Sequence, residues 1–275
     1  VIGNKYKALE KDYRAKFESN KYLILRLDGK AFHSFTKGMK KPFDERLYEI
    51  FKETLKYLCE TVDGVKIGYY QSDEISLVLF NDSPKINKQY WFDNKVEKIL
   101  TIATSICTAK FNSEYNKFGQ FGPKEFGFFD ARGFVVDTLD EVQEYLEWRV
   151  NDSIKNSVYL YAFDKVKENS NPTKALMNKS VKEKIDLLKN EYGVDYYSFD
   201  SKYRKGIFYS KEYTTFVVKK EQYPEHLKED KIVTRRKFKL HESFEKVADI
   251  VDHFRVKGEW LWLIIYLRAI IKLLF

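Results

Sequence analysis

The order of short apolar runs and longer amphipathic segments in the first part of the chain constrains the fold most strongly. Short apolar runs predict buried strands, and segments with apolar residues at helical spacing predict helices. In order along the chain, the sequence predicts a strand over Lys21 to Leu27, a helix over Phe43 to Val62, strands over Val65 to Tyr70 and Ile75 to Phe80, a helix over Asn87 to Tyr115, a strand over Phe128 to Val136 and a helix over Leu139 to Phe163.

The elements up to Val136 follow the order β-α-β-β-α-β, which is typical of ferredoxin-like α+β folds. Such folds build an antiparallel sheet with helices on one face. The pattern weakens later: Lys165 to Lys179 is polar and predicts a loop, before a helix near Val181 to Tyr192 and a strand near Tyr213 to Lys219. We expect residues 1–165 to form one domain and residues 166–275 to form a C-terminal α/β extension packed on it, in a single compact unit.

The charge and the cysteine content narrow the class of protein. There are 49 Lys and Arg residues against 41 Asp and Glu residues, a net charge of +8. This balance favours an anionic partner such as nucleic acid, a nucleotide or an acidic membrane, although charge spread evenly would serve solubility alone. Cys59 and Cys107 lie in apolar helical patterns and are interpreted as packing residues. Two such cysteines make no disulfide framework, which predicts a reducing compartment, the cytoplasm or an organelle.

Neither terminal segment has the pattern of a targeting or membrane-spanning sequence. Val1 to Glu18 is charged and lacks the apolar core of a signal peptide. Trp260 to Phe275 is apolar, but Arg268 and Lys272 interrupt it, and a membrane span needs about 20 mostly uncharged residues. We therefore expect no stable membrane insertion. A terminal helix that docks on the domain or on a second subunit is favoured over an interfacial membrane anchor.

Three carboxylates stand at two turns of the expected sheet. Asp28 ends the first strand, and Asp73 and Glu74 lie between the next two strands. In this topology the first strand and the hairpin are neighbours, so both turns can lie at one edge of the sheet. Carboxylates held this close repel one another, and a hard cation with oxygen ligands such as Mg²⁺ resolves the repulsion. Two such ions can activate an attacking oxygen and stabilise a leaving phosphate. Taken alone, each turn is more often an ordinary solvent-facing turn.

The residues that follow Asp28 are suited to binding phosphate. A glycine, Gly29, lets the backbone approach a ligand closely, and the successive N–H groups of residues 29–33 can bind phosphate oxygens. The combination of carboxylates on two turns, a glycine and nearby cations favours nucleotide chemistry. The cations around this turn are Lys30, His33, Lys40 and Lys41.

Several motifs occur in an order that is typical of one family. They are RLDGKAFHSF (Arg26 to Phe35), KPFDERL (Lys41 to Leu47), YYQSDEISLVL (Tyr69 to Leu79), FDAR (Phe129 to Arg132), YLEWRVND (Tyr145 to Asp152) and YRKG (Tyr203 to Gly206). Together they resemble the tRNA-histidine guanylyltransferase superfamily, over about Gly3 to Arg236. Members of that superfamily look like reversed polymerases, which add nucleotides to the 5′ end of tRNA in the 3′-to-5′ direction. The resemblance implies a polymerase-palm sheet and makes residues 1–165 the catalytic domain.

The resemblance also implies roles for the matching residues. Asp28, the Gly29 carbonyl and Asp73 would hold two Mg²⁺, and Glu74 would support them, which makes Asp28, Asp73 and Glu74 the expected catalytic residues. ATP or GTP would activate a 5′-monophosphate, and the 3′-hydroxyl of an incoming nucleoside triphosphate would then attack it in line. The residues expected to bind the nucleotide are Asp28, Gly29, Lys30, Ala31, Phe32, His33, Lys41, Ser72 and Asp73.

Contacts with tRNA are implied in the same way. Phosphate contacts of this kind position an RNA without reading its sequence, and each cation taken singly is as often ordinary surface charge. The family commonly forms tetramers, in which one subunit can bind the tRNA body while another performs the chemistry, so a homotetramer is expected. The expected tRNA contacts are Arg132, Arg149, Asp152, Asn156, Arg204 and Lys205, with the basic segment Arg235-Arg236-Lys237 as a further phosphate contact.

One departure from the family pattern bears on the substrate. Strict eukaryotic guanylyltransferases carry His-Ile-Asn-Asn after the Trp-Arg motif, and that histidine is tied to recognising the histidine tRNA. This chain has Ile154-Lys155-Asn156-Ser157 there. The difference favours the Thg1-like branch, which repairs 5′-truncated tRNAs by template-directed addition, over a strict tRNA-His guanylyltransferase. A nucleotide cyclase-like enzyme and a non-catalytic RNA-binding protein of the same fold are further alternatives, but the first lacks the later motifs and the second would need degenerate metal ligands.

Overall fold

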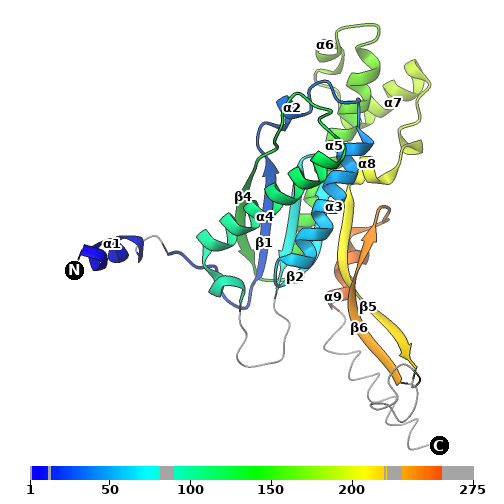
Figure 1. The fold of residues 1–275 in the computed structure, drawn as a ribbon. Helices are drawn as coiled ribbons and strands as arrows, with labels where there is room; N and C mark the ends of the chain where they lie inside the picture. Colours follow the sequence, from blue (N-terminus) through cyan, green and yellow to red (C-terminus); the bar gives the residue numbers. More distant parts are fainter. Residues whose placement is uncertain (1, 12–13, 81–89, 220, 222–230, 256–275) are drawn as a thin grey trace, which may run out of the picture.

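The computed structural model describes residues 2–11, 14–80, 90–219, 221 and 231–255 (Figure 1). The apolar segment from Trp260 to Phe275 lies outside the described residues. The elements are α1 (Ile2–Lys11), β1 (Tyr22–Gly29), α2 (Phe32–Phe35), α3 (Glu45–Thr61), β2 (Val65–Gln71), β3 (Glu74–Leu79), the 3-10 helix η1 (Trp91–Asn94), α4 (Val96–Lys117), β4 (Phe129–Val136), α5 (Leu139–Val166), α6 (Pro172–Leu176), α7 (Val181–Tyr192), the 3-10 helix η2 (Tyr196–Ser198), α8 (Ser201–Lys205), β5 (Ile207–Val218), β6 (Lys231–His241) and α9 (Val247–Arg255).

The strands form one six-stranded sheet in the order β4-β1-β3-β2-β5-β6, with antiparallel pairing throughout. The part β4-β1-β3-β2 is the ferredoxin-like arrangement, so the predicted α+β class is confirmed. β5 then pairs with β2, and β6 with β5. The last two strands continue past the body of the sheet as a two-stranded ribbon (Figure 1).

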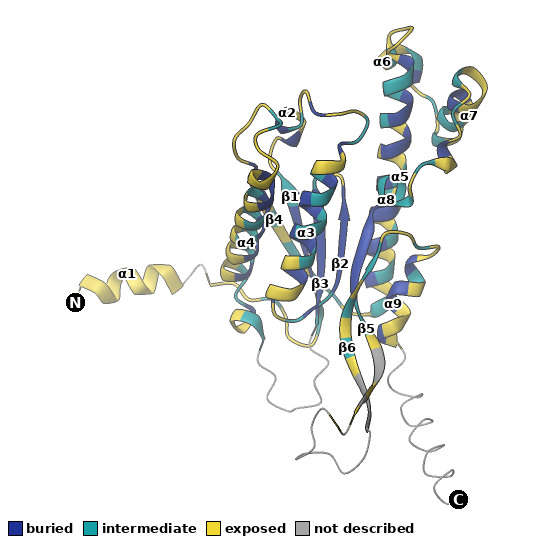
Figure 2. Cartoon of the chain, turned by 45° about the vertical axis from the view of Figure 1, so that its right-hand side comes forward, coloured by how far each residue is buried: buried dark blue, intermediate teal, exposed yellow. Residues whose placement is uncertain are grey.

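Helices cover both faces of the sheet (Figure 2). Leu23, Leu25 and Leu27 of β1 belong to the core beneath α3 and α4. The intervening Ile24 belongs to the core beneath α5 and α9. This split arises because successive side chains of a strand point to opposite faces. The two helices of the β-α-β-β-α-β unit therefore share one face, as the pattern predicts, while α5 and α9 cover the other.

The helix α5 joins the sheet to a small helical cluster. Thr138 begins it with a capping box, in which the Thr138 side chain accepts from the Glu141 backbone N–H and the Glu141 carboxylate accepts from that of Thr138. Its first part packs on the sheet, and its last turns pack on α6, α7 and η2 around Val158, Leu188 and Tyr196. The stretch expected to be a loop, Lys165 to Lys179, thus contains α6.

Several local expectations can be compared with the structure. The helix expected from Asn87 begins at Val96, because Phe92 to Asn94 adopt left-handed backbone angles just before it. Cys59 and Cys107 are buried at 2% and 0% exposure, which confirms that they are packing residues. Among the described residues, no helix is long and apolar enough to cross a membrane. The division of the chain after residue 165 stays a prediction.

Candidate functional site

Asp28 and Asp73 lie on neighbouring turns at one edge of the sheet. Asp28 is near the end of β1, and Asp73 follows Ser72 in the two-residue turn between β2 and β3. The turn requires Ser72 to adopt a left-handed backbone angle, with φ of 55°. The Gly29 N–H donates a hydrogen bond to the Asp73 carbonyl oxygen at 3.0 Å, which fixes the two turns to each other. The structure therefore brings together the two turns that the topology predicts to be neighbours.

The environment of Asp73 opposes its negative charge. Burial raises the pKa of Asp73, and the nearby Asp28 carboxylate raises it further, while a hydrogen bond from the Ser72 hydroxyl at 3.0 Å acts in the opposite direction. A bound cation would remove this unfavourable electrostatic energy. Asp28 has a cationic neighbour of its own, since Nη2 of Arg132 lies 3.8 Å from its Oδ2.

Glu74 is held differently from the two aspartates. It stands opposite Asp28 in the β1–β3 register, but it is 6% exposed and its carboxylate is directed to α5. Nε and Nη2 of Arg149 donate to its two oxygens at 2.7 and 2.8 Å, and Nε of Arg26 lies at 3.7 Å. Burial opposes the guanidinium charge, yet Glu74 outweighs it and raises the pKa of Arg149. This bidentate pair ties the start of β3 to α5 and gives Glu74 a supporting position.

The same pair gives Arg149 an internal role that competes with its expected contact to tRNA. Its side chain is 7% exposed, and its remaining hydrogen bond goes to Asp152 on the same helix at 3.2 Å. An arginine whose fork is occupied by internal carboxylates is not placed to contact tRNA phosphates. Asp152 is thereby engaged as well, and Asn156 donates to it at 3.4 Å from an exposed position. The sequence pattern gave no indication that Arg149 and Glu74 would meet.

The turn expected to cradle phosphate is partly occupied by internal contacts. The N–H of Gly29 bonds to Asp73, and that of Lys30 donates to the Phe128 carbonyl at 2.7 Å. A Cβ at Gly29 would overlap the ring of Phe32, which is 3% exposed in an aromatic cluster, so close packing alone accounts for this glycine. Within the described residues, the backbone N–H groups of Ala31, Phe32 and His33 donate to no protein acceptor. Of the five N–H groups expected to bind phosphate, these three therefore remain available.

A pocket of about 320 Å³ opens beside Asp73. We call it the α2/α8 pocket, because its walls come from α2, the segment leading into α3, the β2–β3 turn and α8. It includes His33, Lys41, Ser72 and Asp73 from the expected site. It also includes residues that the sequence reasoning missed, Lys202 and Tyr203, which lie at and beside the start of the YRKG motif. The remaining lining residues are Phe32, Thr36, Met39, Lys40, Pro42, Phe43, Asp44, Leu47, Tyr48, Tyr70, Gln71, Ser153 and Leu160.

The YRKG motif has a largely internal role. Nζ of Lys205 donates to the carbonyl oxygens of Phe244 and Glu245 at 3.2 and 3.4 Å, and Nε of Arg204 donates to the Phe199 carbonyl at 2.7 Å. These contacts hold the segments around α8 together. Arg204 and Lys205 therefore have a structural role that does not require contact with tRNA.

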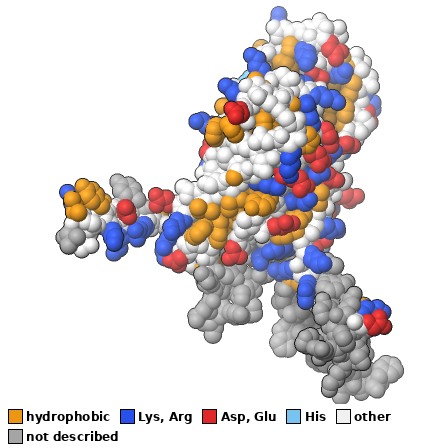
Figure 3. Space-filling model, in the orientation of Figure 1, with side chains coloured by type: hydrophobic (Ala, Val, Ile, Leu, Met, Phe, Trp, Pro, Cys, Tyr) orange, Lys and Arg blue, Asp and Glu red, His pale blue; other side chains and the backbone are white. Residues whose placement is uncertain are grey.

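Of the expected tRNA contacts, Arg132 and Asn156 lie at the surface, and the Arg132 side chain is 57% exposed. Arg235 and Lys237 are exposed on β6, and Arg236 is half-buried with its guanidinium 4.8 Å from the ring of Tyr213. Lysines and arginines are scattered among acids over the visible face, rather than gathered in one field (Figure 3). Exposure alone therefore does not define a path for RNA on this face.

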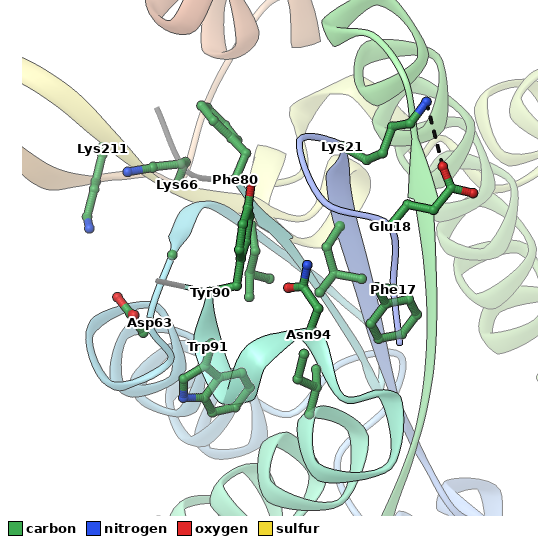
Figure 4. A pocket seen from close by; sticks show the side chains of 14 residues that line it. Phe17, Glu18, Lys21, Asp63, Lys66, Phe80, Tyr90, Trp91, Asn94 and Lys211 are labelled. Carbon is green, nitrogen blue, oxygen red and sulfur yellow. Dashed lines mark ion pairs between the residues drawn. The ribbon is translucent and has the colours of Figure 1, made fainter. Parts of the chain in front are cut away.

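A second cavity, of about 220 Å³, lies at the other end of the sheet (Figure 4). Leu23 and Leu79, at the opposite ends of their strands from Asp28 and Glu74, are among its walls, together with the rings of Tyr90 and Trp91. Lys21 at its rim is turned towards Glu18, 3.9 Å away. This cavity is separate from the predicted carboxylates.

The donor set at the sheet edge suits a metal held jointly with a substrate. Within the described residues no group of three or more His, Cys, Asp or Glu side chains is arranged to hold a metal ion alone. Asp28 and Asp73, which repel each other at the edge of the sheet, nevertheless fit Mg²⁺. This ion is usually bound through one or two carboxylates, waters and substrate phosphates. The arrangement can support phosphoryl transfer.

Comparison with known proteins identifies the family. Residues 3–137 match the family described as tRNAHis guanylyltransferase, and residues 140–252 match the family's C-terminal domain. The tRNA(His) guanylyltransferase of Candida glabrata is 30% identical over 71% of this chain and 87% of its own length. An uncharacterised protein of Acanthamoeba polyphaga mimivirus is 31% identical over 58% of this chain and 62% of its own length.

Solved structures give the same result. A bacterial tRNA(His) guanylyltransferase (Thg1)-like protein in complex with ATP is 37% identical, with a TM-score of 0.71 over 77% of this chain and 89% of its own. Another structure of such a protein, in complex with GTP, is 29% identical, with a TM-score of 0.67 over 92% and 98% of the two chains. The motifs, the sheet and these matches agree: the chain belongs to the tRNAHis guanylyltransferase family and is a nucleotidyltransferase enzyme.

Proposed function

We propose that the chain is a template-directed 3′-to-5′ nucleotidyltransferase that extends the 5′ end of truncated tRNA. The observation that carries the proposal is the meeting of Asp28 and Asp73 at one edge of a palm-like sheet, beside a pocket lined by four basic side chains. Those side chains are His33, Lys40, Lys41 and Lys202. Two related structures are complexes with ATP and with GTP, which supports nucleotide binding by this chain.

The residues of the site divide the work. Asp28, the Gly29 carbonyl and Asp73 would hold two Mg²⁺, which would supply activation of the attacking oxygen and neutralise charge on the leaving phosphate. The free N–H groups of Ala31, Phe32 and His33, with the Lys41 ammonium, would bind triphosphate oxygens.

The supporting residues hold this arrangement in place. The Glu74–Arg149 pair and the Gly29–Asp73 hydrogen bond keep the two turns in position before substrate binds. Such preorganisation is the main source of rate in phosphoryl transfer, and the protein needs no covalent nucleophile.

The choice between repair and addition of a single guanosine depends on α5. Ile154-Lys155-Asn156-Ser157 replaces the His-Ile-Asn-Asn of strict guanylyltransferases, and Ser157 is buried with its Oγ 2.7 Å from the Tyr196 hydroxyl. Lys155 and Asn156 are therefore the exposed residues of this stretch, and neither supplies an imidazole. The second candidate, a strict tRNA-His guanylyltransferase, is favoured by the names of the curated relatives.

A nucleotide-addition assay separates these activities. A labelled 5′-monophosphate tRNA that lacks its first nucleotides is incubated with Mg²⁺, ATP for activation and each nucleoside triphosphate in turn. Repair predicts addition only of the base that pairs with the opposite strand, on several tRNAs. Addition of a single guanosine to the histidine tRNA alone would establish the second candidate. Formation of a cyclic nucleotide without tRNA extension would contradict both.

We also propose that the enzyme acts as a homotetramer. In support, α1 projects from the body of the protein (Figures 1 and 2) and has no buried residue. Ile2, Tyr6 and Leu9 lie along it at helical spacing with 74%, 55% and 53% exposure. Sedimentation of the full chain tests this, and a monomer at working concentrations would contradict it.

A further inference from the structure

We propose that Lys202 binds the anionic part of the nucleoside triphosphate, and that Glu45 holds Lys202 only while the α2/α8 pocket is empty. The inference rests on the proposed function, because it names a further substrate-binding residue for the same site. Lys202 lies on α8, far along the chain from the motifs that contain Asp28 and Asp73. The pocket is therefore lined by residues of both the palm-like domain and the C-terminal extension.

The side chain of Lys202 is fixed against one wall of the pocket. Its Nζ lies 4.3 Å from the ring centre of Tyr48 and 5.1 Å from that of Tyr203, so two aromatic faces stabilise the ammonium. The side chain is 17% exposed, and it is one of the residues that line the pocket. The Tyr48 ring keeps the ammonium in position when its carboxylate partner changes, because the Tyr48 hydroxyl donates to Glu242 and not to Glu45.

Glu45 is suited to be such an exchangeable partner. Its Oε1 lies 2.7 Å from Nζ of Lys202, and its Oε2 accepts a hydrogen bond from the Tyr203 hydroxyl. Burial alone would raise the pKa of Glu45, but the hydrogen bonds from Lys202 and Tyr203 outweigh it and lower that pKa. The Glu45 side chain is nevertheless 57% exposed at the first position of α3, where water can take over its solvation. A well-solvated carboxylate competes weakly against a multiply charged phosphate.

The charges around the pocket favour the exchange. Asp44 is 6% exposed and already saturated: its carboxylate accepts from the backbone N–H groups of Lys40 and Arg46 and from the Arg46 guanidinium. Asp73 is assigned to Mg²⁺ in the proposed function. Because Asp44 is paired and Asp73 would be neutralised by Mg²⁺, the lysines of the pocket leave an excess of positive charge for an incoming triphosphate. Lys202 is the lysine that the C-terminal extension contributes.

If Lys202 exchanges Glu45 for the triphosphate, the two residues should have opposite effects on nucleotide binding, which a fixed structural ion pair would not show. Binding of Mg·ATP and Mg·GTP to the full chain is measured by calorimetry for Lys202→Met, Glu45→Gln and the double variant. We expect Lys202→Met to weaken binding about tenfold and Glu45→Gln to strengthen it, because glutamine still accepts from Tyr203 but no longer competes for the ammonium. In the Lys202→Met background, Glu45→Gln should have no effect. Weakening by both single variants would mean a structural pair and would overturn the proposal, as would strengthening by Glu45→Gln in both backgrounds.

Steady-state kinetics and two further variants complete the test. Lys202→Met should raise KM for the nucleotide with kcat nearly kept, and Lys202→Arg should restore most of the affinity. Lys182→Met removes an exposed lysine of the same extension that does not line the pocket, and it should leave binding unchanged. If the chain binds nucleotides in the expected way but extends no tRNA, the proposed function fails and Lys202 keeps its role. If it extends tRNA and Lys202→Met binds normally, the role of Lys202 fails alone.

Discussion

The backbone N–H of Gly29 donates to the carbonyl oxygen of Asp73 at 3.0 Å, so one hydrogen bond joins the two turns that carry the candidate metal ligands. Backbone groups make this link, which leaves both aspartate side chains available. The cost is electrostatic, because the two carboxylates are held near each other and the pKa of Asp73 is raised. The free protein carries this cost as a loss of stability, which a bound cation would offset.

Asp73→Asn should abolish nucleotide addition and stabilise the fold. Burial and Asp28 raise the folded-state pKa of Asp73, so the folded protein binds more protons than the unfolded one, and this group lowers stability as pH rises through that range. Removing the charge should raise Tm at neutral pH by roughly 2–4 °C without Mg²⁺. Differential scanning calorimetry and the addition assay measure both effects. A lower Tm for Asp73→Asn would mean that the carboxylate is structural.

Arg149→Ala should destabilise the fold rather than only weaken RNA binding. It leaves the Glu74 carboxylate buried and without its bidentate partner, which costs about 3–5 kcal/mol. Lys165→Ala, which removes an exposed pair with Glu168, should cost less than about 1 kcal/mol in the same urea titration. The combined variant Glu74→Gln/Arg149→Met should recover part of the loss. Equal stability of Arg149→Ala and wild type would contradict the buried pair.

Arg132 and Lys205 should differ in the salt dependence of tRNA binding. Arg132 is exposed beside Asp28, whereas Lys205 bonds two backbone carbonyls between β6 and α9. Arg132→Gln should reduce the slope of log K against log salt by about 1, and Lys205→Met should leave the slope unchanged while lowering stability by about 1 kcal/mol. Filter binding over a salt series measures the slopes. The opposite pattern would restore Lys205 as a phosphate contact.

Gly29→Ala should disturb nucleotide binding through Phe32. The added methyl overlaps the Phe32 ring, so α2 must shift. The N–H groups of Phe32 and His33, which are expected to bind phosphate, would move with it. We expect a loss of about 1–3 kcal/mol of stability and weaker nucleotide binding. Gly3→Ala, where a Cβ meets open space, is the matched control. Wild-type affinity in Gly29→Ala would show that the position of α2 does not affect the nucleotide.

The sheet could be predicted because its pattern is local. The apolar runs at Lys21 to Leu27 and Ile75 to Phe80, with a helix between, leave few topologies open, and that order predicts that Asp28 lies near Asp73. The start of α4 and the existence of α6 were missed, because a left-handed turn and a helix of one or two turns leave weak periodic signals.

The fold class, the family motifs and the carboxylates at the two turns can be read from the chain alone, because strand alternation and turn chemistry act over a few residues. The contacts of each polar side chain are instead set by tertiary packing. It turned Arg149 inward to Glu74, used Lys205 to hold backbone carbonyls, and brought Lys202 to the α2/α8 pocket. These contacts join residues far apart in the chain, and a charged residue has the same appearance in a sequence whether its partner is water, a buried carboxylate or a substrate. The sequence does not distinguish these cases because the energy of a charge depends on its burial and its neighbours, both of which arise from packing.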